Sequence, residues 1–65
     1  MNTEDMNMEP AGFIPIVRSF EFGEDAHGVK DTADQAIKAL ARIKKKADKL
    51  DDGVERTYLI EVLFQ

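Results

Sequence analysis

The sequence contains no cysteine, no tryptophan, one histidine and two prolines, and it has no long apolar run. Without cysteine the chain can form neither disulfides nor thiolate zinc sites, and His27 alone does not build a histidine-rich metal site. No stretch approaches the roughly 20 apolar residues that cross a membrane as a helix. The sequence therefore predicts no cofactor, no metal site and no membrane partner.

The first residues are polar and acidic, with neither the basic start nor the apolar segment of a secretory signal peptide. We expect a flexible acidic arm over residues 1–12, a single small domain over residues 13–60, and a cytoplasmic location. A chain of this length draws only roughly 3–5 kcal/mol of stability from its own core. Because disulfides and metals are excluded, we expect a partner protein to supply further stability.

Charge is segregated along the chain, whose net value is −4. Residues 1–31 hold seven acidic and two basic side chains, a balance of −5, whereas residues 38–49 hold six basic side chains and one acidic, a balance of +5. This division is typical of a surface that attracts a charged partner. An acidic arm lying over its own basic helix is the other interpretation.

Residues 13–22, FIPIVRSFEF, alternate between their two faces with the period of two that is typical of a β-strand. Pro15 has no N–H to donate, so we expect its end of the strand to be an edge, or the strand to begin just after it. The next segment, GEDAHG at residues 23–28, has two glycines framing polar residues. This composition predicts a loop.

A long amphipathic helix over residues 32–50 is the clearest pattern in the chain. Asp31 or Thr32 can cap its N-terminus, and Gly53 can end it as a left-handed residue. Apolar side chains recur at three- and four-residue steps and form an apolar stripe, which consists of Ala33, Ala36, Ile37, Leu40, Ile43, Ala47, Leu50 and Val54. Cations on the opposite side form a basic face, which consists of Lys38, Arg42, Lys45, Lys46 and Lys49.

The segment after the helix supports two interpretations. Asp52-Gly53-Val54-Glu55 resembles a capping box that would start a short second helix. Residues 56–60 alternate and are rich in strand-forming side chains, which favours a final strand. We therefore predict an α+β fold, strand–helix–strand, with one long amphipathic helix packed on a small sheet. The alternative is an all-α helical hairpin.

Two strands joined through a helix run parallel when they are neighbours in a sheet, with a right-handed crossover. We accordingly expect the first and last strands to pair in parallel. Such a sheet has exposed edges, and the alanines of the apolar stripe permit close approach of another element. Both features indicate association with a second copy or with another protein.

The last five residues, Glu61-Val62-Leu63-Phe64-Gln65, resemble the recognition sequence of picornavirus 3C protease, which is commonly placed between a protein and a removable tag. The protease cuts after the glutamine, and the usual leucine before the glutamate is Ile60 here. The resemblance implies that residues 61–65 are a purification remnant. The native chain would then end near Ile60.

The sequence offers little for catalysis. Glu24, Asp25 and His27 lie close together and could bind a cation or act in acid–base chemistry, but a solvent-facing loop explains them more simply. Ser19 belongs to no grouping of histidine and carboxylate that the sequence reveals. Neither a glycine-rich phosphate loop nor the calcium-loop spacing of an EF-hand is present. We predict no catalytic site and a protein that is not an enzyme.

The apolar stripe and the basic face lead to two functional hypotheses. In the first, the chain is a non-enzymatic protein-interaction module that binds itself, or binds a larger protein as a small subunit or inhibitor. In the second, it is a nucleic-acid-binding accessory protein whose basic face follows a phosphate backbone. The overall acidity and the lack of aromatic residues among the lysines disfavour the second hypothesis.

Overall fold

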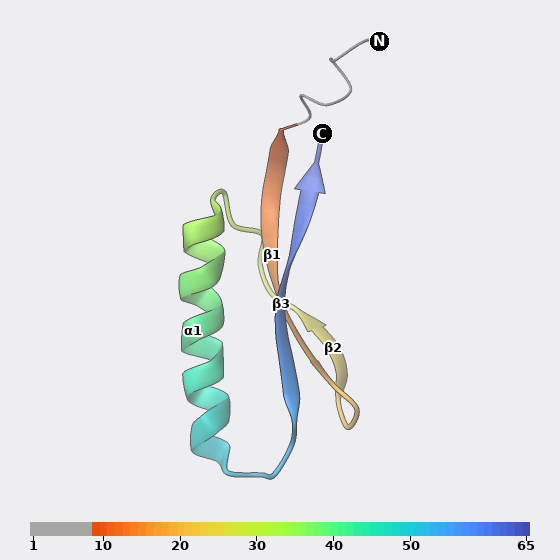
Figure 1. The fold of residues 1–65 in the computed structure, drawn as a ribbon, viewed down its shortest axis with the longest axis vertical. Coiled ribbons are helices and arrows are strands. Elements are labelled where there is room, and N and C mark those ends of the chain that lie inside the picture. Colours follow the sequence, from red (N-terminus) through yellow and green to blue (C-terminus); the bar gives the residue numbers. More distant parts are fainter. Residues whose placement is uncertain (1–8) are drawn as a thin grey trace.

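A computed structural model describes residues 9–65 as a three-stranded antiparallel sheet with one helix packed against it (Figure 1). The elements are β1 (Pro10–Ser19), β2 (Gly23–Ala26), α1 (Ala33–Leu50) and β3 (Arg56–Phe64). The strand order is β2-β1-β3, so β1 is the middle strand. The predicted α+β class with a helix on a small sheet is confirmed, and the helical-hairpin alternative is not supported.

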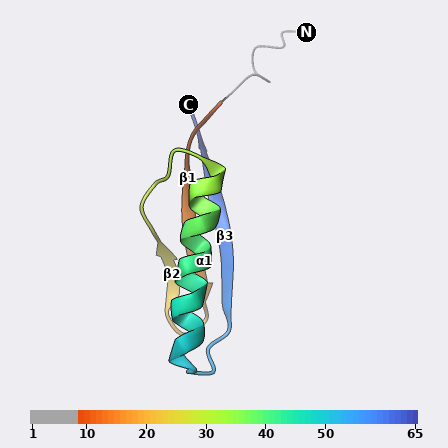
Figure 2. The ribbon, with the colours of Figure 1, turned by 90° about the vertical axis from the view of Figure 1, so that its left-hand side faces the viewer.

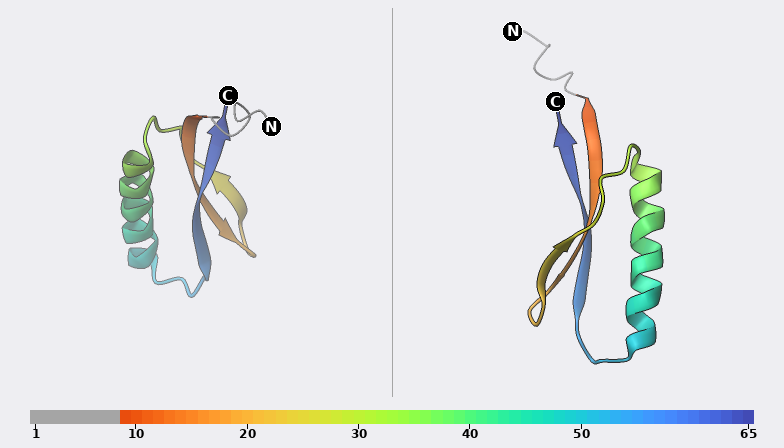
Figure 3. Two further views of the ribbon diagram at one scale, coloured as in Figure 1. Left: turned by 45° about the horizontal axis from the view of Figure 1, so that its top comes forward. Right: turned by 180° about the vertical axis from the view of Figure 1, so that it is seen from behind.

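β1 and β3 pair antiparallel, with Ile16 opposite Leu59 near the centre of the ladder. The expected parallel pairing is therefore wrong, and the reason is an additional strand. β2 carries the chain back to the end of the sheet where β1 begins, as the views in Figure 3 show. The helix then runs in the same direction as β1, and β3 has to return in the opposite direction.

A tight hairpin connects β1 to β2, in the segment where the sequence predicts strand and then loop. β1 ends at Ser19, whose Oγ accepts a hydrogen bond of 3.0 Å from the N–H of Phe22. Gly23 follows with φ of 74° and pairs with Ser19, the pattern of a three-residue hairpin loop closed by a left-handed residue. Residues 20–22 are thus turn rather than strand, and residues 23–26 are strand rather than loop.

The expectation that Pro15 marks an edge is also wrong, because it lies in the middle strand. The carbonyl of Pro15 accepts from the N–H of His27 at 2.9 Å, and Phe13 exchanges two hydrogen bonds with Lys30 on the same side. The odd-numbered residues of β1 therefore direct their backbone groups toward β2. The missing donor of Pro15 falls just past the end of β2 at Ala26, and the ladder with β3 loses nothing.

The helix begins and ends with side-chain and backbone features that its sequence supplies. Thr32 is the N-cap, and its Oγ1 accepts from the N–H of Gln35 at 3.2 Å, which confirms one of the two predicted caps. The Oε1 of Gln35 accepts in return from the N–H of Asp31 at 3.1 Å. At the other end Asp51, rather than Gly53, is the left-handed C-cap, with φ of 47°. Aspartate is one of the few residues with a side chain that tolerates this conformation.

The helix covers one face of the sheet (Figure 2). Residues directly opposed in an antiparallel ladder share a face, so Val17 and Tyr58 lie on one face while Ile16 and Leu59 lie on the other. Tyr58 lines a hollow with Ala47 of the helix, which places α1 on the face of Val17 and Tyr58. The opposite face carries no helix within residues 9–65, so the side chain of Ile16 on that face is covered by the strands and their connecting segments rather than by α1.

The core is thin. Ile16, at the middle of β1, is 1% exposed, and Ala36, near the start of α1, is 0% exposed. Pro15 is also buried, and a Cβ at Gly12 would lie 2.5 Å from Cγ1 of Val29, so a side chain there requires Val29 to shift. The small side chain of Ala36 lets the helix approach the sheet closely.

The two ends of the described chain meet in the sheet. Pro10 pairs with Phe64, and the N–H of Gln65 donates to the carbonyl of Glu9 at 3.5 Å. Residues 10–12, which we expected to belong to a flexible arm, are therefore part of β1, while residues 1–8 of that arm lie outside the described residues. Of residues 61–65, the expected purification remnant, residues 61–64 are paired with the first half of β1.

We expect Ala36→Leu to lower the free energy of unfolding by about 2 kcal/mol, because the larger side chain forces the helix away from the sheet. Ala41→Leu is the matched control, since Ala41 is exposed on the same helix and leucine has nearly the helix propensity of alanine. Urea denaturation followed by circular dichroism measures the free energy of unfolding of both variants. Equal losses in the two variants would show that Ala36 does not set the distance between helix and sheet.

Candidate protein-interaction surface

The apolar stripe divides into an inner and an outer part in the structure. Its inner residues are buried or half-buried: Ala36, Leu40, Ile43 and Ala47 on α1, and Val54, which lies beyond the end of α1 in the loop that leads to β3. Its outer residues remain exposed, and they are Ala33, Ile37 and Leu50. Ile37 is 54% and Leu50 64% exposed. The stripe thus holds the domain together and also leaves two large apolar side chains free for contact.

The basic face is solvent-exposed along its whole length. Lys38, Arg42, Lys45, Lys46 and Lys49 are all exposed. Within residues 9–65, none of the five forms an ion pair. Lys38 and Arg42 lie with Lys30 around a hollow of about 280 Å³ at one flank of the helix. The structure therefore brings three cations together, two of them from the predicted basic face.

The hairpin tip exposes two aromatic side chains that the sequence pattern places on a strand face. Phe20 is 101% exposed and Phe22 is 72% exposed. The residue that could have predicted this turn is Gly23. It follows the three residues after Ser19 and closes the turn with a positive φ. An exposed pair of aromatic rings is the composition that protein interfaces favour.

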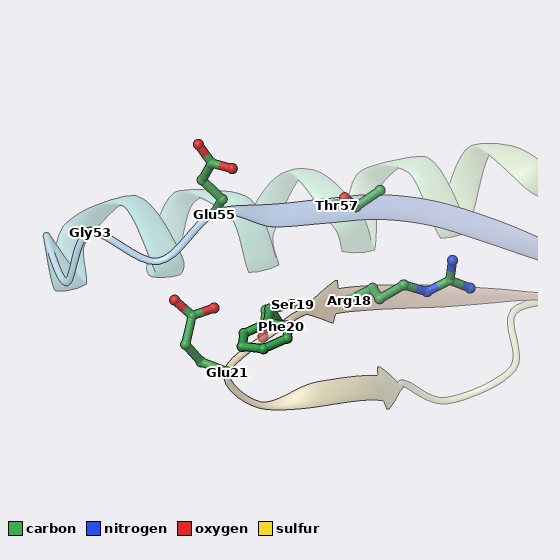
Figure 4. A pocket seen from close by; sticks show the side chains of 7 residues that line it. All are labelled: Arg18, Ser19, Phe20, Glu21, Gly53, Glu55 and Thr57. Atoms are coloured by element: carbon green, nitrogen blue, oxygen red, sulfur yellow. The ribbon is translucent and has the colours of Figure 1, made fainter.

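A shallow hollow of about 610 Å³ opens beside this tip, on the sheet face opposite the helix (Figure 4). The residues that line it come from the end of β1, the hairpin turn and the start of β3: Arg18, Ser19, Phe20, Glu21, Gly53, Glu55 and Thr57. Arg18 is already bound to Glu24, with nitrogen–oxygen distances of 2.9 and 3.3 Å. The carboxylates of Glu21 and Glu55 stand at the rim, so the hollow is acidic at its mouth.

The grouping of Glu24, Asp25 and His27 does not come together as one site. Glu24 is held by Arg18, whereas Oδ2 of Asp25 lies 3.5 Å from Nε2 of His27. Adjacent residues of a strand point to opposite faces, which separates Glu24 from Asp25. Over residues 9–65, no three acidic or histidine side chains gather in a way that could hold a metal ion.

Arg56 and Asp52 form the tightest ion pair of the described chain, at the point where the loop enters β3. Nη2 of Arg56 lies 2.7 Å from Oδ2 of Asp52, and Nη1 lies 3.1 Å from Oδ1. The guanidinium bonds and the N–H of Val54 hold the pKa of Asp52 at about 2. The same guanidinium lies 6.0 Å above the ring of Phe22, so it links the loop to the hairpin tip.

No helix in residues 9–65 is long and apolar enough to cross a membrane. No family model, curated protein or solved structure matches this chain. The described surface combines exposed aromatic side chains at the hairpin tip and exposed aliphatic side chains of α1 with a separate basic helix face.

Replacing Asp52 with asparagine should remove one source of pH-dependent stability. The pKa of Asp52 is about 2 in the folded protein, below its ordinary 3.8. Its carboxylate therefore stabilises the fold fully above about pH 4, and this contribution is lost as the pH falls toward 2. We expect the Tm of the unaltered chain to fall more steeply below about pH 4 than the Tm of Asp52→Asn.

Asp51→Asn is the control for this experiment, because Asp51 is the neighbouring carboxylate and makes no bond to Arg56. Circular dichroism melting curves from about pH 2 to pH 6 report all three proteins. If Asp52→Asn and Asp51→Asn melt with the same pH profile, the ion pair contributes nothing to stability.

Proposed function

We propose that the chain is a non-enzymatic protein-interaction module, which binds a second copy of itself or binds a larger protein as a small subunit or inhibitor. The observation that carries this proposal is the imbalance between buried and exposed apolar side chains. Ile16 and Ala36 are the buried hydrophobic residues of the described chain, together with Pro15. Within residues 9–65, seven large hydrophobic side chains are exposed: Phe20, Phe22, Val29, Ile37, Leu50, Val62 and Phe64.

Binding would stabilise a domain of this kind as well as use its surface. Each large apolar side chain that moves from water into an interface contributes about 1.5–3 kcal/mol. A few such residues would match the roughly 3–5 kcal/mol that so small a core supplies. A cytoplasmic location belongs to the proposal as well, since a chain without cysteine needs no oxidising compartment.

Light scattering and concentration-dependent melting test this function on the untagged chain. If the chain binds itself, we expect its apparent mass or its Tm to rise with protein concentration. If it binds a larger protein, we expect that protein to co-purify with it from the native source and the two purified proteins to reconstitute a stoichiometric complex. A folded monomer that shows neither behaviour contradicts the proposal.

Phe20→Ser, Ile37→Ser and Leu50→Ser each remove one apolar patch, and at least one of them should weaken binding about tenfold or more. Asp34→Ser is the control at an exposed polar position outside the candidate surface.

The cluster of Lys30, Lys38 and Arg42 supports a second candidate function, binding of a nucleic-acid backbone. We propose it as the alternative because these cations surround one hollow and none is paired within residues 9–65. Contacts with about three phosphates give a slope near −3 in a plot of log affinity against log salt. A fluorescence titration with duplex and single-stranded probes at two salt concentrations measures it.

Arg42→Glu should reduce such binding about tenfold or more at low salt. Lys44→Glu is the matched control, since it makes the same change of charge on the opposite flank of the helix, beside Tyr58. Absence of salt-sensitive binding, or equal loss in both variants, removes the nucleic-acid function from consideration.

A further inference from the structure

The two edges of the sheet differ in a way that singles out one of them for pairing. β2 is a four-residue edge with two acidic side chains, and its regular pairing with β1 ends at Ala26, beyond which only His27 and Lys30 still bond to β1. Short length, charge and irregularity are the usual protections of an edge strand. β3 is a nine-residue edge without proline or glycine, and Arg56 and Glu61 are its only charged residues. Its outer side lacks these protections.

The register identifies the backbone groups of β3 that are free. The odd-numbered residues of β1 direct their backbone N–H and C=O groups toward β2. The even-numbered residues, such as Ile16, therefore exchange hydrogen bonds with their partners in β3. Those partners are the odd-numbered residues of β3, including Leu59 opposite Ile16. The even-numbered residues of β3 therefore direct their N–H and C=O groups away from the sheet. These residues are Arg56, Tyr58, Ile60, Val62 and Phe64.

Exposed apolar side chains accompany this edge on the helix side. Val62 and Phe64 lie on the same sheet face as Tyr58, the face that α1 covers, and both remain exposed. Ile37 lies two helical turns before Lys44, which lines a hollow with Tyr58, so Ile37 points along the flank nearest β3. It is 54% exposed.

Ile37 also lies at the level of Ile60. Lys30 pairs with Phe13, and Phe13 pairs with Val62, which aligns the start of α1 with this part of β3. Four helical residues advance the chain about 6 Å from Ala33 to Ile37. Two strand residues span about 7 Å from Val62 back to Ile60. The exposed Ile37 therefore lies above the midpoint of the nine-residue strand.

We propose that two copies of this chain pair through their β3 edges, antiparallel and centred on Ile60, to form one continuous six-stranded sheet. This inference rests on the proposed function and names its partner as a second copy. The axis at Ile60 pairs all nine residues of each strand and makes the free even-numbered groups the hydrogen-bonded positions. Ile60 meets its own copy, Tyr58 meets Val62 of the second copy, and Phe64 meets Arg56 of the second copy.

The charges of β3 agree with this self-pairing. Centred on Ile60, Glu61 lies opposite Leu59 of the second copy and Arg56 lies opposite Phe64, so no like charges face each other across the new ladder. A two-fold axis perpendicular to the sheet keeps both helices on one face. The two β1 strands beneath them are then three strand spacings apart, about 14 Å. The two Ile37 side chains, the Val62 side chains and the Phe64 side chains fill the space between the helices.

Val62→Pro tests this pairing directly. The N–H of Val62 points away from β1, so proline removes a hydrogen bond of the dimer and none of the monomer. Val62→Ala is the matched control, which shortens the side chain and keeps the N–H. Sedimentation velocity from about 1 to 300 µM should show the unaltered chain and Val62→Ala approaching twice the 7.3 kDa chain mass. Val62→Pro should raise the dissociation constant at least tenfold over Val62→Ala.

Ile37→Glu provides a second variant that leaves the strand untouched, and it should also raise the dissociation constant at least tenfold. If circular dichroism shows that Val62→Pro does not fold, Ile37→Glu tests alone whether the dimer forms through β3. A dimer that survives the folded Val62→Pro, or survives Ile37→Glu, overturns β3 pairing and leaves the proposed self-association standing. A monomer throughout the concentration range overturns the dimer, while binding to a larger protein is decided separately by reconstitution.

Discussion

The antiparallel ladder between β1 and β3 is the interaction on which the rest of this structure depends. It joins the two ends of the described chain, and Ile16 at its centre is the most buried large side chain. The β1–β2 hairpin would be only marginally stable without a third strand, and α1 packs on both β1 and β3. Because these strands lie far apart in sequence, their pairing has to offset the entropy of closing a long loop.

One helix on one face of a three-stranded sheet leaves the domain with more apolar surface than it can bury. The hairpin tip, the β3 flank of the helix and the outer half of β3 all present aromatic or aliphatic side chains to solvent. The same exposed apolar surface therefore limits the stability of the domain and favours binding to a partner. Any partner that covers these side chains stabilises the fold, and the free edge of β3 adds backbone groups that only another strand can pair in series.

Residues 61–64 belong to the segment that resembles a protease recognition sequence. They pair with the first half of β1 and so form part of the ladder between β1 and β3. Without them the pairing of β1 and β3 would extend only from Ser19 opposite Arg56 to Pro15 opposite Ile60. If these residues are a purification remnant, the remnant lengthens both the sheet and the edge available for association.

The sequence alone determined the elements whose pattern is local. The helix, its cap at Thr32 and its division into an apolar stripe and a basic face follow from side-chain periodicity and short-range hydrogen bonding. The final strand follows from alternation in the same way. Four residues of the eight-residue stripe are buried or half-buried on the helix and a fifth, Val54, is half-buried in the loop into β3, while Ile37 and Leu50 remain exposed. Periodicity identifies a helix face but not how much of it the sheet is wide enough to cover.

Only the tertiary structure decided the direction of pairing, the position of Pro15 and the exposure of Phe20 and Phe22. Each depends on the hairpin that Gly23 closes, since β2 reverses the chain and places β1 in the middle of the sheet. The contact of Arg56 with Phe22 joins residues that are distant in sequence and had no local signal. Strand partners are chosen by long-range packing, which the alternation of a single strand does not encode.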